Sequence, residues 1–514
     1  MSLARCHSVA LVGVDGHVVE VEADLNNGIP GLVIIGLPDT SLYEARDRVR
    51  AAITNSGEEW PMRKITLALS PASLRKTGSS FDLAMAMAVL GASGAVPLES
   101  APALIMLGEL ALDGRVRAVR GVLPALLAST KAGFDRAVVA HANVAEARLL
   151  PGLRVHGVAS LAELVAWLRG GARDVPFLES AEPQPAPGEE FGGRDLSDVL
   201  GQSGGRRVVE VAAAGGHHVL FTGPPGTGKT MLAERLPGVL PALDRAAALE
   251  VTAVHSVAGH LPAGMPLVTR PPLSAPHHTA SVAALVGGGS GIPRPGAASL
   301  AHRGVLLLDE APEFASGVLD ALRQPLESGE VVLARAAGTA RYPARFQLVL
   351  AANPCPCAPV TGIALQCTCT PQARLRYAAR LSGPLLDRVD IRHEVLSPNR
   401  AEMDADRDHL ESSAVVAARV VLARERAVQR LAGSGWRTNA EVSGVALRRH
   451  YPPTLDARRI VEREQDRGLL SARGVDRVLR VGWTLADLDG ADRPARGHID
   501  EAIMLRGGVP RVAA

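Results

Sequence analysis

Residues 223–230 combine glycines, a lysine and a hydroxyl side chain in an order that suits the binding of phosphate groups. The segment consists of Gly223, Pro224, Pro225, Gly226, Thr227, Gly228, Lys229 and Thr230. In this pattern, GxxxxGK followed by Ser or Thr, the glycines let consecutive backbone N–H groups turn toward the phosphates. We expect Lys229 to reach the β- and γ-phosphates and the Thr230 hydroxyl to ligate Mg²⁺. An apolar run (218–222) precedes the loop and a helical run (231–236) follows it, which is the setting that the motif needs.

Two later apolar runs end in polar residues that suit hydrolysis of a triphosphate. Residues 304–308 lead into Asp309 and Glu310. We expect Asp309 to hold the water shell of Mg²⁺ and Glu310 to polarise the attacking water. Residues 346–352 lead into Asn353, whose amide is placed to orient that water. An Asx turn before the next proline is the alternative for Asn353.

Two arginines are candidates for a contact with the phosphates. Arg388 follows a predicted helix, and Arg473 begins a helix near the C-terminus. Phosphoryl transfer uses a guanidinium on the γ-phosphate, and a neighbouring subunit often supplies it. A surface salt bridge is the alternative role for both residues.

Four of the five cysteines fall within residues 355–369. They form two CxC pairs, Cys355 with Cys357 and Cys367 with Cys369. Four thiolates at this spacing predict one tetrahedral Zn²⁺ site, structural because no ligand position is left open. Exposed thiols in a reducing compartment are the alternative.

Two pairs of adjacent histidines, 217–218 and 277–278, also stand near these motifs. Adjacent side chains in a strand face opposite sides. We therefore expect separate hydrogen-bonding roles for the members of each pair, and no shared metal ion.

The elements that position these residues must have aliphatic cores, because only 3% of the 514 residues are aromatic. Broad aromatic stacking platforms for nucleic acid are therefore disfavoured. A net charge of +2 gives no overall attraction to polyanions, so any such contact is local. Without a membrane-length apolar run or a signal peptide, the chain is expected to be cytoplasmic and away from membranes.

Composition and periodicity predict an α/β multi-domain protein and indicate where its domains begin and end. A tract rich in Pro, Gly and Glu at 175–194 is expected to be a linker. Before it, residues 1–174 alternate short apolar runs, such as the expected strands at 9–12 and 32–35, with helical patterns, such as the expected helix at 122–132. After it, 195–398 show a second α/β pattern that contains the phosphate loop, and 399–514 are expected to be all helical.

The order of these motifs resembles an AAA+ ATPase, and several stretches resemble the ComM (YifB) subfamily of magnesium-chelatase-like ATPases. The resemblance covers nearly the whole chain, and the segments that carry it are 114–124, 209–218, 274–281, 342–348, 382–390 and 471–489. It implies an ATP- and Mg²⁺-dependent ring, expected to be a homohexamer. It also implies that Asn353 is a sensor, that Arg388 is a finger acting on the next subunit, and that Arg473 is the sensor of a helical lid.

The resemblance gives meaning to two further segments. Residues 255–300 correspond to an insertion that forms an extra β-element in this clade. Residues 329–343 are a predicted β-hairpin from their own pattern, two apolar arms around a glycine-containing turn. In related ring motors this hairpin grips DNA, and Arg335 and Arg341 are candidates for phosphate contacts. Solvated surface arginines are the alternative.

Residues 1–174 resemble the proteolytic domain of Lon-type proteases, with Ser80 near the nucleophile position. The stretch expected to supply the activating lysine, 119–124, contains leucine instead. An unactivated serine is a poor nucleophile, so we expect no peptidase activity.

The resemblance as a whole implies a motor acting on single-stranded or branched DNA, with branch migration or helicase activity in recombination or natural transformation. Two alternatives stay open. One is the motor subunit of a magnesium chelatase, and the other is an ATP-dependent protein remodeller without peptidase activity.

Overall fold

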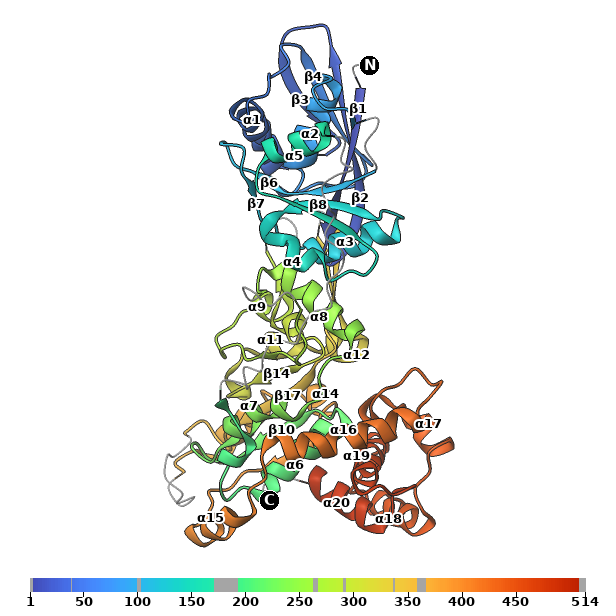
Figure 1. The fold of residues 1–514 in the computed structure, drawn as a ribbon. Coiled ribbons are helices and arrows are strands. Elements are labelled where there is room, and N and C mark those ends of the chain that lie inside the picture. The colour runs from blue at the N-terminus through green and yellow to red at the C-terminus, as the bar shows by residue number, and fades with distance from the viewer. Residues whose placement is uncertain are drawn as a thin grey trace.

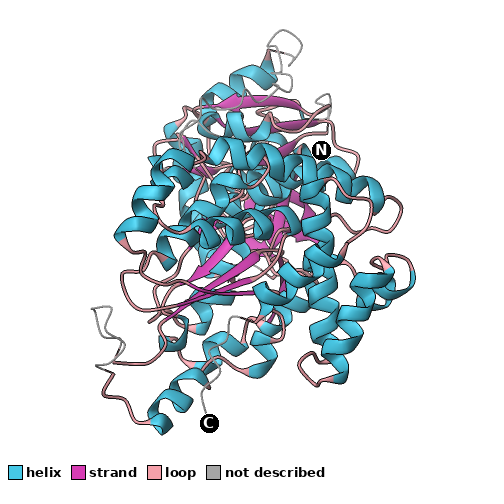
Figure 2. Cartoon of the chain, turned by 90° about the horizontal axis from the view of Figure 1, so that it is seen from below, coloured by secondary structure: helices cyan, strands magenta, loops and turns pink. Residues whose placement is uncertain are grey.

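The structure is a computed structural model that describes residues 3–37, 39–98, 103–170, 193–261, 267–289, 293–335, 338–357 and 367–507. The chain extends along one direction, with the N-terminal residues at one end, the central residues next, and the C-terminal helices to one side of the other end (Figure 1). Seen from below, the strands run through the interior and helices lie around them (Figure 2). The linker expected at 175–194 falls outside the described residues except for 193–194.

A seven-stranded mixed sheet organises residues 3–170. Neighbouring residues of its central strands face opposite sides, so that Val9 packs with α3 and Ala10 packs with α2. Helices therefore cover both faces of this sheet. In spatial order its strands are β3 (Gly31–Ile35), β4 (Lys64–Ser70), β2 (Asp15–Asn26), β1 (Leu3–Val12), β5 (Ile105–Leu107), β8 (Arg136–Ala140) and β9 (Arg154–Val158). The other elements are α1 (Thr40–Asn55), α2 (Asp82–Ala92), the pair β6 (Glu109–Leu110) and β7 (Val116–Arg117), α3 (Val122–Lys131), η2 (His141–Asn143), α4 (Val144–Ala147) and α5 (Leu161–Arg169).

A second sheet of five parallel strands carries the phosphate loop. Its inner strands are apolar along their length, because both faces of the sheet are covered. In spatial order the strands are β11 (Leu273–Ser274), β14 (Val305–Leu308), β17 (Gln347–Ala352), β10 (Val219–Thr222) and β18 (Ile391–Glu394). The helices around them are η4 (Leu196–Asp198), α6 (Ser203–Gly215), α7 (Lys229–Val239), α8 (Arg245–Ala258), η5 (Ala311–Glu313), α11 (Ser316–Asp320), α12 (Arg323–Ser328), α13 (Pro371–Ala378) and α14 (Gly383–Leu386).

Between β10 and β18 the described chain also forms two antiparallel strand pairs. One falls where the resemblance implies an extra β-element, and the other falls where the sequence pattern predicts a hairpin. The insertion at 255–300 contains α9 (Val282–Val286), the paired strands β12 (Gly287–Gly288) and β13 (Arg294–Pro295), and α10 (Ala297–Leu300). The hairpin consists of β15 (Glu330–Arg335) and β16 (Gly338–Pro343). Its tip positions, 336–337, lie outside the described residues.

From residue 400 onward the described chain is helical, as the sequence predicts. α19 (Ala472–Asp489) lies at the centre of this part and packs against α16, α20 and α6. The C-terminal helices therefore rest on the helix that leads into the phosphate loop. The remaining helices are α15 (Arg400–Asp406), η7 (Arg407–His409), α16 (Ser413–Arg430), η8 (Asn439–Glu441), α17 (Gly444–Arg449), α18 (Leu455–Asp466) and α20 (Arg496–Arg506). Among the described helices, none is long and apolar enough to cross a membrane.

The N-terminal part contacts two elements of the central part of the chain, the helix α8 and the hairpin β15–β16. Ser256 of α8 accepts a hydrogen bond from the backbone of Gly121 (3.0 Å) and donates one to the buried carboxylate of Glu146. Gly13 forms a bridge with Arg341, at the turn between β1 and β2. This turn thus touches the hairpin.

Candidate nucleotide-binding site

The residues expected to bind and hydrolyse the nucleotide follow directly after three parallel strands. β10, β14 and β17 end at Thr222, Leu308 and Ala352. Thr222 pairs with Ala352, the last residue of β17. Leu308 pairs with Leu350, two residues before the end of that strand. Gly223, Asp309 and Asn353 therefore emerge together at the carboxyl edge of the sheet, where open parallel sheets bind their ligands.

Gly226 and Gly228 let the loop turn into α7. Their φ angles are +76° and +97°, a region that favours glycine. Lys229 is the first residue of α7 and is 7% exposed. Burial lowers the pKa of Lys229, and the carboxylates of Asp309 and Glu310 partly offset this effect.

The ammonium of Lys229 points back across the loop. Nζ donates to the carbonyl oxygens of Gly223 (2.8 Å) and Pro224 (2.7 Å) and to Oδ1 of Asn353 (3.1 Å). The Thr227 hydroxyl also donates to Pro224 (2.9 Å). The structure therefore brings the predicted asparagine into contact with the predicted phosphate-binding lysine.

Thr230 and Asp309 form the pair that suits Mg²⁺. The Thr230 hydroxyl donates to Oδ2 of Asp309 at 2.8 Å. A hydroxyl and a carboxylate oxygen at this separation are the hard ligands that Mg²⁺ takes together with phosphate oxygens and water. The donor set therefore fits the ion that the sequence predicts here.

Glu310 has an uncommon backbone conformation and a partner that the sequence does not predict. Its φ is +50°, in the left-handed region that non-glycine residues seldom adopt, and its N–H donates to Oδ1 of Asp309 (2.9 Å). Its Oε2 lies 3.1 Å from Nδ1 of His278. Backbone conformations of this kind are concentrated at functional sites.

Arg388 and Arg473 lie together, away from the loop. Arg388 follows α14 and precedes β18, so it stands at the amino edge of the sheet, opposite the loop. It forms an ion pair with Glu327, and Arg473 pairs with Asp387 at 2.9 Å. Among the described residues, neither arginine has a polar contact with the phosphate loop of its own chain.

These two arginines belong to a cluster of like charge. Burial lowers the pKa of Arg388, and the charges of Arg323, Arg473 and Arg477 lower it further. The cluster therefore concentrates arginines at the amino edge of the sheet, away from the phosphate loop.

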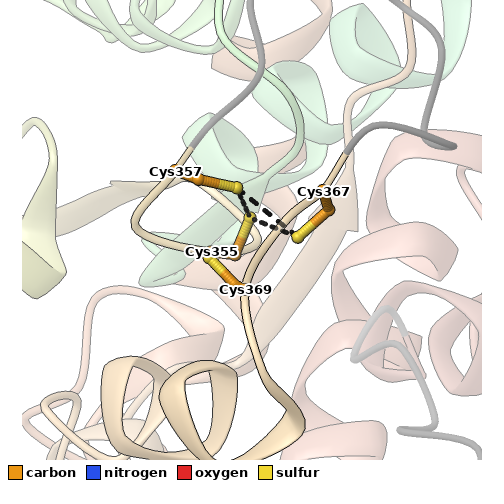
Figure 3. A group of neighbouring side chains, drawn as sticks. All are labelled: Cys355, Cys357, Cys367 and Cys369. Carbon is orange, nitrogen blue, oxygen red and sulfur yellow. Dashed lines mark hydrogen bonds between the residues drawn. The ribbon is translucent and has the colours of Figure 1, made fainter.

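The four cysteines predicted to bind zinc meet at one place. The sulfurs of Cys355, Cys357 and Cys367 lie 3.3–3.5 Å apart, and all four sulfurs are within 4.8 Å of one another (Figure 3). A disulfide has sulfurs about 2.05 Å apart, whereas thiolates around tetrahedral zinc are about 3.8 Å apart. The backbone N–H of Cys369 and the neighbouring thiols lower the pKa of Cys367 to about 7. The residues between the pairs, 358–366, lie outside the described part.

The two hairpin arginines differ in their surroundings. Arg335 is exposed and ends β15 next to the tip. Arg341 lies further from the tip, and its Nη1 is 2.8 Å from Oε1 of Glu330. Of the two, Arg335 is the better placed to contact an external polyanion.

In the N-terminal part, the stretch in which Lon-type proteases carry the activating lysine holds a core residue, Leu123. Leu123 is fully buried in α3, and its N–H donates to Glu146 at 2.7 Å. Lys76 is also buried, and its Nζ donates to the carbonyl oxygens of Gly36 (3.0 Å) and Pro71. Within the described residues, no lysine therefore forms a hydrogen bond with Ser80.

The histidine pairs have separate partners, as expected, but one geometric expectation is wrong. His277 contacts the Thr279 hydroxyl at 2.9 Å, whereas His278 contacts Glu310. These two rings do not face opposite sides, because their centroids are 4.1 Å apart. Residues 277–278 lie in a turn after β11 and not in a strand, so the alternation of strand side chains does not apply.

The sequence does not predict the contact of His278 with Glu310, because the spacing of these two residues matches no known motif. It also does not predict the contacts of His217 with Asp390 and Thr484. Both sets of contacts join residues that are distant in sequence, and only the fold brings them together.

Comparison with known protein families supports the interpretation of the loop. The family profile described as magnesium chelatase, subunit ChlI, matches residues 195–403. Profiles described as subunit ChlI of Mg-chelatase and as its C-terminal region match residues 21–143 and 410–506.

Full-length relatives agree with these profiles. An uncharacterized protein of Mycobacterium tuberculosis is 54% identical over 506 residues, 98% of this chain and 99% of that protein. Protein YifB of Escherichia coli is 42% identical over 506 residues, 98% of this chain and 97% of its own length. The competence protein ComM of Haemophilus influenzae is 40% identical over 509 residues, 98% of each chain.

A partial match involves a different protein. A Lon protease of Salinispora arenicola is 27% identical over 170 residues, 31% of this chain and 22% of that protein.

The phosphate loop, the acidic strand end beside it and full-length identities of 40–54% lead to one conclusion. The chain belongs to the ComM/YifB subfamily of magnesium-chelatase-like AAA+ proteins.

Proposed function

We propose that the protein is an ATP-hydrolysing ring motor of the ComM type that acts on DNA. One observation carries the proposal: the phosphate loop and the Arg388 cluster stand at opposite edges of one parallel sheet. A strand of four residues spans about 13 Å, so Arg388 is beyond reach of its own loop. A site that needs both is therefore completed by a second copy of the chain. A head-to-tail interface of this kind generates a ring when its rotation closes, and a closed ring is what we propose here.

Each residue of the site has a role in this mechanism. Lys229 would bind the β- and γ-phosphates, while Thr230 and Asp309 would hold Mg²⁺, which when bound neutralises developing negative charge. Glu310 polarises the attacking water and Asn353 orients it. Arg388 of the neighbouring copy contacts the γ-phosphate, a contribution worth 10³–10⁵-fold in kcat for arginine fingers in general. Arg473 accompanies Arg388 through its pair with Asp387.

The proposed track is single-stranded or branched DNA, and the proposed assembly is a hexamer. Support comes from the relative named competence protein ComM. It also comes from the hairpin, whose first strand ends at the exposed Arg335. Because the net charge is only +2, the contact with DNA must be local to such elements.

We also propose that the four cysteines hold one structural Zn²⁺. Four thiolates close the coordination sphere, so the ion contributes folding free energy and no reaction step. The site would fix the segment that follows Asn353, because Cys355 is only two residues further along the chain.

The experiment that tests the motor compares ATP hydrolysis without cofactor, with single-stranded DNA, with forked DNA and with denatured protein. We expect both DNAs to raise kcat and the forked DNA to be unwound or migrated. Stimulation by denatured protein alone would favour a protein remodeller. A Glu310→Gln variant is expected to bind ATP and assemble but not to turn over, and normal turnover would refute the assigned role.

A further inference from the structure

Arg388 lies in the segment 387–390, and arginines of the C-terminal helices contact the other residues of this segment. Three contacts do this: Arg473 with Asp387 (2.9 Å), Arg506 with the carbonyl of Val389 (3.2 Å) and Arg477 with Asp390 (3.0 Å). Two of these arginines lie on α19 and one lies on α20. The segment and these helices are therefore joined as one unit.

Asp390 extends this unit to the strand that carries the phosphate loop. Its carboxylate is 1% exposed, and its Oδ2 accepts a hydrogen bond from Nδ1 of His217 at 2.9 Å. His217 is fully buried and lies two residues before β10. Burial by itself raises the pKa of Asp390, but the hydrogen bond and charge of His217, with the charges of Arg477 and Arg480, hold it below its usual value. Asp390 is therefore a buried carboxylate held in ionised form by its partners.

The other nitrogen of His217 reaches the helical part. Nε2 lies 2.7 Å from the hydroxyl of Thr484 on α19. Thr484 also accepts from Nδ2 of Asn439 (3.1 Å), which donates to Asp487 (2.8 Å). A Cβ at Gly215 would lie 2.1 Å from His217 Nε2 and 2.3 Å from the Thr484 hydroxyl. Only glycine at the end of α6 leaves room for this contact.

We propose that His217, Asp390 and Arg477 are positioning residues that set Arg388 and Arg473 for the phosphate of the neighbouring subunit. The inference rests on the proposed function, because it assumes that Arg388 acts on the next copy. The loop stands at one end of β10 and His217 at the other, so this cluster joins a subunit's own nucleotide site to the finger that it offers its neighbour.

The first test is an Asp390→Asn variant, which keeps the size of the side chain and removes its charge. A displacement of about 1 Å at a reacting group costs on the order of 10²-fold in rate. We expect kcat to fall roughly 10- to 100-fold, with KM for ATP and binding of a fluorescent ATP analogue unchanged. Loss of ATP binding would show that Asp390 acts on its own loop and would overturn the proposal.

Mixed assemblies identify the subunit on which the cluster acts. Glu310→Gln provides an intact finger and an inactive site, whereas Asp390→Asn provides an intact site and a displaced finger. In an equal mixture, about a quarter of the interfaces combine an intact site with an intact finger, because each interface draws its two parts from different copies. We expect hydrolysis to recover to about that fraction of the wild-type rate.

An Arg388→Ala variant mixed in the same way separates the two hypotheses. Recovery with Arg388→Ala but not with Asp390→Asn would overturn the positioning role and leave the shared site intact. If neither mixture recovers, the shared site itself is wrong.

A Thr484→Val variant guards against misfolding of Asp390→Asn. It removes the direct contact of His217 with α19 and leaves the Asp390–Arg477 pair in place. The same fall in kcat, with rescue by Glu310→Gln, is expected. Wild-type kcat in Thr484→Val, or loss of assembly in both variants, would contradict the proposal.

Discussion

Nδ1 of His278 lies 3.1 Å from Oε2 of Glu310, which ties the turn after β11 to the residue proposed to polarise the attacking water. The contact occupies one of the two carboxylate oxygens. His278 therefore restrains Glu310, and the turn that carries it lies a few residues before the insertion element α9–β12.

Removal of this restraint is expected to raise basal ATP hydrolysis. We predict that His278→Ala increases kcat without DNA by about two- to fivefold, a change of roughly 0.5–1 kcal/mol in barrier, at unchanged KM. His278→Gln, which keeps a donor, is the matched control and should stay near the wild-type rate. A fall in kcat of His278→Ala would mean that the contact assists hydrolysis.

The loop should tolerate a side chain at Gly226 better than at Gly223. A Cβ at Gly226 meets no atom within 4 Å, whereas at Gly223 it would lie 2.1 Å from the carbonyl oxygen of Val395. Both residues have positive φ. We expect Gly226→Ala to lower the free energy of unfolding by about 1 kcal/mol and Gly223→Ala by about 3 kcal/mol or more. Urea denaturation measures both, and equal losses would contradict the close approach of the loop to Val395.

Zinc is expected at about one equivalent per chain in protein purified without chelator. Elemental analysis should show its loss in Cys367→Ser, with a melting temperature several degrees lower, because binding free energy of the metal is folding free energy. Cys6→Ser is the control, since Cys6 is buried in the N-terminal sheet, outside the cluster. Full zinc content in Cys367→Ser would exclude the four-thiolate site.

His218 is expected to make the protein less stable in mild acid. Burial lowers the pKa of His218 to about 4, and the charges of Arg477, His217 and Arg480 contribute while Asp390 opposes them. Its neutral Nδ1 accepts from the N–H of Leu348 at 2.9 Å. The unfolded pKa is about 6.5, so this contribution is complete above pH 6.5 and is lost as the pH falls toward 4.

The loss from His218 amounts to about 2 kcal/mol between pH 7.5 and pH 5. His218→Asn keeps an acceptor for Leu348 but does not titrate. Urea denaturation at the two pH values should show that the variant loses about 2 kcal/mol less than the wild type. Parallel losses in both proteins would place the acid sensitivity elsewhere.

No peptide hydrolysis is expected from the N-terminal part. Leu123 fills the place of an activating lysine, and the ammonium of Lys76 is engaged by backbone carbonyls. Labelled casein should stay intact with the wild type and with Ser80→Ala, with or without ATP. Cleavage by the wild type that disappears in Ser80→Ala would contradict this expectation.

Much of the fold can be predicted from local patterns, because alternation and helical periodicity report burial directly. The expected strand at Leu32–Ile35 and the expected helix at 122–132 correspond closely to β3 and α3. Element ends are less predictable, since β1 pairs with β2 from Leu3 onward, six residues before the apolar run at 9–12 begins. The histidines at 277–278 were misjudged because a turn, not a strand, carries them.

By itself, the sequence determined that a phosphate loop, an acidic strand end and an asparagine strand end lie together, because parallel strands deliver their carboxyl ends to one edge. It also determined the cysteine cluster, since four ligands within fifteen residues leave little freedom. Only the tertiary structure decided that Arg388 stands at the opposite edge, that His278 holds Glu310, and that His217 joins two strands to α19. These contacts depend on strand order and helix packing between residues up to 267 positions apart, which local sequence patterns do not encode.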